Sequence, residues 1–290
     1  LISALLSRKG YEVIAISSNK SAKAINQKGL LVSSSNYGNF RQFVEAKPVL
    51  DVPVDYIFFT TKYPYLLASF DRIEEKKIGD PAFVSLLNGL GSREKIIEHF
   101  GSKFLNGSIG SIEVFRDGNG KICQPQKQRA HIDLSKEKEV EEIIMERLVK
   151  VISSLDISVT TYPSHDEVIW KKLVRLGAIA SATAAYQKPI GEIRDNEDSR
   201  NVLIGLVEEG VEVAKSIGIK IKGSQTIKDI DRLPHNLNTS LARDLRQSKP
   251  SEIEAITLAI VTKAKENSIN ARHYKSILRI IKEKYNVAKS

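Results

Sequence analysis

Hydrophobic positions in the first half of the chain form short, nearly continuous runs separated by helix-like stretches. Residues 54–60 and 82–87 are apolar at almost every position, a pattern typical of strands that are buried on both faces of a parallel sheet. Residues 11–16 are rich in apolar and β-branched side chains and predict another strand. Residues 64–77 are compatible with a helix. This alternation of strands and helices predicts a doubly wound α/β domain.

The second half of the chain is dominated by helical patterns. Apolar residues recur at helical spacing in residues 166–186, 199–217, 238–247, 251–266 and 271–285. The stretch from residue 251 opens with the sequence SEIE after Pro250, which is the pattern of a capping box at a helix start. We therefore expect an α/β domain over residues 1–160 and an all-helical domain over residues 161–290.

The sequence begins inside a predicted helix. Residues 1–8 are helix-like and end at Gly10, and the strand predicted at 11–16 follows at once. In a Rossmann-type dinucleotide-binding domain, that helix comes after a first strand and a G-x-G-x-x-G turn, and the sequence contains neither. We expect a Rossmann-type domain that lacks both. Truncation explains this better than a true loss, because a missing central strand would leave the edges of its neighbours unpaired.

The charge balance bears on the class of partner. The net charge is +9, from 44 lysines and arginines against 35 acidic residues, but the basic residues are spread along the chain and mixed with acids, as at residues 71–77. Without an arginine-rich arm or an aromatic RNA-binding signature, we expect no nucleic-acid partner, and the basic balance suits small anionic ligands.

The apolar stretches also bear on location. None approaches the roughly 18–20 residues of a membrane span. The N-terminal segment has its basic residues after its apolar run, the opposite order to a signal peptide. We expect a cytoplasmic protein with no membrane contact.

Cysteine and histidine are sparse. The single cysteine, Cys123, excludes an internal disulfide and a cysteine-clustered metal site, and we interpret it as a passive thiol. The five histidines are scattered without ligand spacing. We therefore expect no metal site.

Four motifs carry a resemblance to a known family. They are TTK at 60–62, LNGLG at 87–91, IWKKL at 169–173 with PIGE at 189–192 after its helix, and TSLARD at 239–244 followed by Glu252. Together and in this order, they resemble the ketopantoate reductase family over nearly the whole chain. The resemblance implies an NADP-dependent oxidoreductase that reduces a 2-oxo acid, 2-dehydropantoate, to pantoate, a step of pantothenate and coenzyme A biosynthesis. It also implies a homodimer.

Lys172 matches the proton donor of that family. Hydride delivered to a 2-oxo carbon leaves an alkoxide that needs a proton, and a lysine ammonium in a partly desolvated site is a suitable acid. Lys171 points about 100° away around the helix, so only one of the pair faces a given site. The alternative for Lys172 is an ordinary solvated helix lysine.

The resemblance assigns further roles. It implies that Asn88 and Ser240 bind substrate and that Lys62, Asn88 and Glu252 bind the cofactor. Lys62 and Asn88 follow the carboxyl ends of successive predicted strands, where α/β sheets bind ligands. Each residue also has a structural alternative: a turn for Asn88 in Asn-Gly, a helix cap for Ser240, and a favourable helix-dipole position for Glu252.

The end of the strand at 11–16 indicates the cofactor. NAD-specific folds usually have an acidic residue there for the ribose hydroxyls, whereas this chain has Ser18, Asn19 and Lys20. Small polar groups with a lysine suit a 2′-phosphate, so we expect NADP, bound in part by these three residues.

The chain departs from the family at three positions. Where the family has substrate-binding asparagines, this sequence has Leu176, Ala180 and Ile190. An apolar wall would leave polar groups of the substrate unpaired, at about 1–3 kcal/mol each.

Three explanations remain open. The substrate is a different, more apolar 2-oxo acid, handled by a related two-domain dehydrogenase. Neighbouring residues, namely Arg175, Ser181 or Thr183, supply the contacts. Or the protein is a diverged, non-catalytic nucleotide-binding relative. We favour an active reductase, because Lys172, Asn88, Ser240 and Glu252 occur together.

Overall fold

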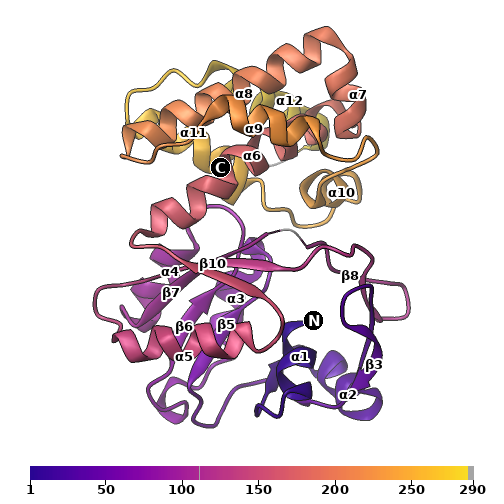
Figure 1. The fold of residues 1–290 in the computed structure, drawn as a ribbon, viewed down its shortest axis with the longest axis vertical. Helices are drawn as coiled ribbons and strands as arrows, with labels where there is room; N and C mark the ends of the chain where they lie inside the picture. Colours follow the sequence, from indigo (N-terminus) through magenta and orange to yellow (C-terminus); the bar gives the residue numbers. More distant parts are fainter. Residues whose placement is uncertain (111, 287–290) are drawn as a thin grey trace. The chain divides into compact units, whose positions relative to one another are not determined.

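The structure, a computed structural model, describes residues 1–110 and 112–286 and divides into two compact units (Figure 1). The sheet unit comprises Leu1–Thr60, Tyr65–Leu86 and Ile96–Pro163. The helical unit comprises Thr61–Pro64, Leu87–Lys95 and the chain from Ser164 onward. The predicted class, an α/β part followed by an all-helical part, is confirmed. Two loops from the first half of the sequence, 61–64 and 87–95, are grouped with the helices.

The described strands of the sheet unit form three sheets rather than a single one. Their bounds are β1 Ile14–Ile16, β2 Leu30–Ser34, β3 Gly38–Gln42, β4 Glu45–Lys47, β5 Tyr56–Phe59, β6 Ala82–Ser85, β7 Phe104–Gly110, β8 Phe115–Arg116, β9 Ile122–Gln124, β10 His131–Lys136 and β11 Ser158–Thr161. The largest sheet has the order β11-β10-β7-β6-β5, in which only the β7–β10 pair is antiparallel. The other sheets are β1-β4 and β3-β2-β9-β8.

The predicted buried strands form the centre of the largest sheet. All four residues of β6 are buried, because helices cover both of its faces. On one face, Phe83 stacks with Phe59 and with Phe100 of α4 (Ser92–Phe100), while Phe70 of α3 (Leu66–Phe70) meets Phe59 and Phe100 edge to face. On the other, α5 (Glu142–Ser153) contributes Met145, Leu148 and Ile152 to a core with Val84 and Leu105. The remaining helices of this unit are α1 Ile2–Arg8 and α2 Asn19–Lys28.

Two predictions for this unit are corrected. The strand expected at 11–16 is shorter, because only Ile14–Ile16 pairs, with β4. The helix expected at 64–77 is broken into two short 3₁₀ turns, Tyr63–Tyr65 and Glu75–Lys77, around α3. The break has a tertiary cause. The backbone of residues 72–74 bonds to Leu50 instead, through Leu50 N–H to Arg72 C=O and Glu74 N–H to Leu50 C=O.

The helical unit is built around the long helix α6 (His165–Tyr186). From Gly177 to Ala185, every α6 residue is buried and most are small, so that neighbouring helices approach closely. The helices α8, α10 and α12 pack against it (Figure 1). The other bounds are α7 Ile190–Asp195, α8 Glu197–Ser216, α9 Gly223–Asp231, α10 Ser240–Arg246, α11 Ala259–Glu266 and α12 Arg272–Tyr285.

The capping box predicted at residue 251 is wrong. The helical segment there begins with a π-helical turn, Glu254–Leu258, whose N-cap is Ile253 and has no side-chain cap hydrogen bond. The turn leads directly into α11. In this wider turn, the Leu258 N–H bonds to the Ile253 carbonyl, five residues back. π-turns of this kind are common at functional sites.

Candidate active site

Lys172, the predicted proton donor, lies half-buried on α6 and donates a hydrogen bond to the side chain of Asn88. The distance from Lys172 Nζ to Asn88 Oδ1 is 2.6 Å. The two residues are 84 positions apart, and they meet because the loop after β6 packs on the helical unit. An Asn-Gly turn by itself needs no such partner, so the loop that carries Asn88 is joined to α6 by this side-chain contact.

Asn88 also joins Lys172 to Glu252. Its Nδ2 donates to Glu252 Oε2 at 3.2 Å. With an ammonium on one side and a carboxyl on the other, the amide has one favourable orientation, with its oxygen toward the lysine and its nitrogen toward the glutamate. The three residues therefore form one ordered chain, Lys172–Asn88–Glu252.

Glu252 is a buried carboxyl with only 5% of its surface exposed. Burial raises the pKa of Glu252 above its usual value of 4.5, although several neighbours oppose this, namely the Asn88 amide, the Tyr63 backbone N–H, Lys172 and Lys62. These four neighbours of Glu252 come from α6 and from the loops after β5 and β6. Glu252 therefore connects these segments of the helical unit.

The raised pKa of Glu252 predicts a pH-dependent effect of Glu252→Gln on stability. Below pH 4.5, the carboxyl is protonated in both the folded and the unfolded chain, so its pKa shift costs nothing. As the pH rises through the raised pKa, ionisation favours the unfolded state, and the wild type loses stability that the variant keeps.

Denaturant unfolding of both proteins over a pH series tests this expectation. The free energy of unfolding of the variant minus that of the wild type should increase with pH. A difference that is constant, or that falls with rising pH, would show that Glu252 is not held in a desolvated site.

Lys62 and Ser240 lie beside a second carboxylate, Asp244. The Lys62 ammonium binds both oxygens of Asp244, at 2.7 and 2.6 Å. Asp244 follows Ser240 by one helical turn on α10, so the two share a face of that helix. Ser240 is not the helix cap, because Thr239 fills that role by accepting from the Ala242 N–H. Ser240 is half-buried, and among the described residues no hydrogen bond to its hydroxyl is present.

Sequence reasoning assigned no role to Asp244 or Tyr63. Asp244 lies in the TSLARD motif, four residues after Ser240, and this spacing on a helix was the available signal. Tyr63 contributes through its backbone N–H, which any residue other than proline can supply. No sequence signal could therefore have identified it.

Gly89 lets the loop that carries Asn88 approach the π-turn closely. The Leu90 N–H donates to the Ala255 carbonyl at 2.8 Å, an acceptor within the turn Glu254–Leu258. Gly89 has a φ of +82°, and a Cβ built on it would overlap that same carbonyl oxygen. Asn88 thus directly precedes a segment, Gly89 and Leu90, whose backbone lies against the π-turn.

The predicted phosphate-binding residues Ser18, Asn19 and Lys20 belong to the sheet unit, at the start of α2. All three are exposed. Ser18 caps the helix by accepting from the Ser21 N–H at 3.3 Å. Arg72, which sequence reasoning missed, donates to the Ser17 carbonyl at 3.0 Å, and the buried Ser17 hydroxyl has no hydrogen-bond partner among the described residues. Two cations, a helix N-terminus and hydroxyl groups suit an anionic phosphate.

The positions that match the family's asparagines differ in exposure. Leu176 is half-buried on the helical unit, whereas Ala180 and Ile190 are fully buried in its core. Ser181 and Thr183 are also fully buried, and their hydroxyls pair with Thr257 and Thr239, each at 2.8 Å. The hydroxyls of Ser181 and Thr183 are therefore used in packing between helical segments.

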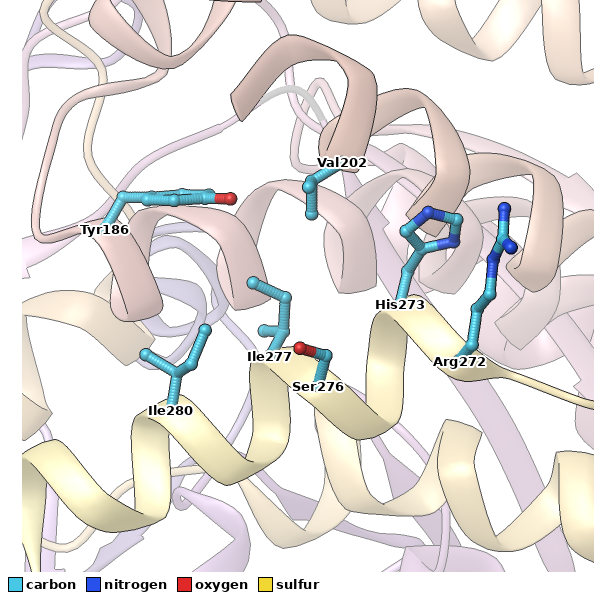
Figure 2. Close-up of a pocket in the computed structure, with 7 residues that line it drawn as sticks. All are labelled: Tyr186, Val202, Arg272, His273, Ser276, Ile277 and Ile280. Carbon is cyan, nitrogen blue, oxygen red and sulfur yellow. The ribbon is translucent and has the colours of Figure 1, made fainter. Parts of the chain in front are cut away.

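A separate cavity of about 310 Å³ lies between α6, α8 and α12 (Figure 2). It shares no residue with the Lys172 cluster. Its wall includes the His273 ring, whose Nδ1 is 2.8 Å from Glu209 Oε1. The lining residues are Tyr186, Val202, Arg272, His273, Ser276, Ile277 and Ile280.

Two features of the described residues bear on other classes of function. Across residues 1–110 and 112–286, no group of three or more histidine, cysteine, aspartate or glutamate side chains is arranged to hold a metal ion. Within the same residues, every helix is too short or too polar to cross a bilayer.

Comparison with known proteins gives matches over both units. Residues 1–137 match a family model described as ketopantoate reductase PanE/ApbA, and residues 164–285 match the model of the C-terminal part of the same family. The chain is similar to the 2-dehydropantoate 2-reductase of Archaeoglobus fulgidus, with 24% identity over 97% of this chain and 92% of the relative. A protein of the same name from Pyrococcus abyssi is 27% identical over 93% of this chain and 89% of the relative.

Solved structures agree in fold. The 2-dehydropantoate 2-reductase from Geobacter metallireducens has a TM-score of 0.87 and 20% identity, covering 98% of this chain and 95% of its own. A D-mandelate dehydrogenase in a ternary complex with NADH and anilino(oxo)acetate has a TM-score of 0.83 and 19% identity, covering 99% of this chain and 96% of its own. Identities this low show a shared fold.

Proposed function

Since the chain belongs to the ketopantoate reductase family, we propose that it reduces 2-dehydropantoate to pantoate with NADPH, a step of pantothenate and coenzyme A biosynthesis. The observation that carries this proposal is the ordered chain Lys172–Asn88–Glu252, in which a lysine ammonium is held at 2.6 Å by an amide oxygen. Reduction of a 2-oxo group needs such a positioned acid.

Lys172 performs the proton transfer in this proposal. NADPH, when bound, supplies the hydride that adds to C2 of the substrate. As the carbonyl π electrons move to oxygen, the Lys172 ammonium stabilises the developing negative charge and gives up a proton to form the alcohol. The lysine is left neutral and takes a new proton from solvent.

Asn88 and Glu252 position that acid. The Asn88 oxygen accepts one of the three N–H bonds of the ammonium and so fixes where Lys172 points. Glu252 holds the amide nitrogen and prevents the amide from turning over. In this proposal Asn88 and Ser240 also contact the substrate, and Ser240 is suited to it because Thr239 already caps α10.

The sheet unit holds the adenosine end of the cofactor in this proposal. Ser18, Asn19 and Lys20 would contact a 2′-phosphate, with Arg72 as a further cation beside Ser17. The Ser17 hydroxyl directly after β1, which has no partner in the described part of the chain, supports a polar ligand there. Lys62, Asn88 and Glu252 are proposed to contact the cofactor as well, and Asp244 would keep the Lys62 ammonium in place.

A second candidate is the reduction of a more apolar 2-oxo acid. It is favoured by Leu176, which is half-buried one helical turn from Lys172 where the family has an amide. The structural neighbour named D-mandelate dehydrogenase was solved with NADH and a 2-oxo acid analogue that carries an aromatic group.

A comparison of substrates tests the proposal. Purified protein would be assayed by nicotinamide absorbance with 2-dehydropantoate and with phenylglyoxylate, each with NADPH and with NADH. We expect the highest kcat/KM with 2-dehydropantoate and NADPH. A preference for phenylglyoxylate would establish the second candidate, and oxidation of neither nucleotide with either acid would contradict reductase activity.

A further inference from the structure

One stripe of α6 remains partly exposed while the rest of the helix centre is buried. Lys172, Arg175 and Leu176 are half-buried, and they lie at positions i, i+3 and i+4. At about 100° per residue, Arg175 and Leu176 lie within about 60° of Lys172 on either side of it. The stripe thus presents an acid, a second cation and an apolar side chain on one face.

Arg175 is the charged residue of this stripe to which the proposed reaction assigns no role. Among the described residues, no hydrogen bond or ion pair to its guanidinium is present. Arg175 and Lys172 carry the same charge one helical turn apart on α6, so the two cations repel each other. An anion bound beside both cations would relieve this repulsion.

The other candidates for an anion contact on this part of α6 are excluded by burial. Ser181 and Thr183 are fully buried, and their hydroxyls pair with Thr257 and Thr239. Ala180 is fully buried as well. Of the three neighbouring residues that sequence reasoning offered, only Arg175 is accessible.

We propose that Arg175 binds the carboxylate of the 2-oxo acid while Lys172 faces its 2-oxo oxygen. The inference rests on the proposed reductase function and names the group that fixes its substrate class. A guanidinium binds a carboxylate through two parallel N–H bonds. The two functional groups of a 2-oxo acid are on adjacent carbons, which matches two cations one helical turn apart. Leu176 then contacts the apolar part of the substrate.

The test compares 2-dehydropantoate with its methyl ester, which keeps the 2-oxo group and lacks the charge. In the wild type, kcat/KM should be at least about tenfold higher for the acid, as expected for one charge-assisted carboxylate contact. Arg175→Gln should raise KM for the acid about tenfold or more, change kcat less, and leave the ester unaffected. The ratio of kcat/KM for the acid to kcat/KM for the ester should therefore fall sharply in Arg175→Gln. Arg175→Lys should restore part of this ratio.

Lys171→Gln is the matched control. It removes the same charge from the same helix, about 100° away from Lys172, and Lys171 already pairs with Glu167 at 2.8 Å. This variant should keep the acid-to-ester ratio of the wild type.

The outcomes separate the two claims. A wild-type ratio in Arg175→Gln would overturn the role of Arg175 and leave the reductase function standing. Equal loss of acid and ester turnover in that variant would point to a general structural role and would also overturn the inference. Absence of turnover on both compounds in the wild type would overturn the reductase function, and the inference with it.

Discussion

Replacing Lys172 with alanine is expected to lower kcat for 2-oxo acid reduction by about 100-fold to 10,000-fold, the usual contribution of a positioned general acid. Asn88 would keep its contact with Glu252 but lose the ammonium that its oxygen holds. Because the proposed phosphate-binding residues lie in the sheet unit, the affinity for NADPH should change little. Steady-state turnover and a separate NADPH binding titration measure the two effects.

Lys171→Ala is the control for this variant. It removes an adjacent lysine whose ammonium pairs with Glu167 at 2.8 Å, so it tests whether loss of any positive charge on α6 is enough. The control should retain turnover within a fewfold of the wild type. If Lys172→Ala were as active as Lys171→Ala, Lys172 would have no part in the chemistry.

Gly89→Ala is expected to be the most destabilising single change at the site. At a φ of +82°, a side chain adopts a left-handed conformation that costs about 1–2 kcal/mol. The new methyl group would also overlap the Ala255 carbonyl oxygen, and overpacking of this kind adds about 1–3 kcal/mol. We expect the free energy of unfolding to fall by about 3 kcal/mol and kcat to fall with it, because Asn88 is the preceding residue.

Gly218→Ala separates the backbone contribution from the contribution of the overlap with Ala255. Gly218 also has a positive φ, +86°, but nothing lies within 4 Å of a Cβ at that position. This variant should lose only the backbone contribution of about 1–2 kcal/mol and keep full activity. Denaturant unfolding and turnover of both variants give the comparison. Equal losses of stability and turnover in Gly89→Ala and Gly218→Ala would show that the close approach of Gly89 to Ala255 does not position the loop.

The fold could be predicted where a pattern depends on local burial. The apolar runs at 54–60 and 82–87 contain β5 and β6, and the stretch predicted to be helical at 166–186 corresponds to α6. The helix expected at 64–77 failed because the backbone of residues 72–74 bonds to Leu50, a contact that hydrophobic periodicity does not contain. The capping box at residue 251 failed because the helical segment begins later, with Ile253 as its N-cap, and its first turn is a π-turn whose Ala255 carbonyl accepts from the Leu90 N–H, a contact that local sequence does not contain.

The candidate site was predicted through motifs rather than periodicity. The resemblance selected Lys172, Asn88 and Glu252, and the structure brings these three together. The partnership of Lys62 with Asp244 joins residues 182 positions apart, which single-residue reasoning does not reveal. The same limit applies along α6. Leu176 and Ala180 share the face of Lys172 by spacing, yet only Leu176 is accessible, because neighbouring helices cover the later turns.

The central claim is that the Lys172 ammonium protonates the 2-oxo oxygen, and the pH dependence of a single turnover tests it most directly. Protein loaded with NADPH would be mixed rapidly with 2-dehydropantoate, and the loss of nicotinamide absorbance followed across a pH series. We expect the wild-type rate to fall as the pH rises and the ammonium is lost, and Lys172→Ala to be slow without that fall. The same pH-dependent fall in Lys172→Ala would contradict the claim, because another group would then be the proton donor.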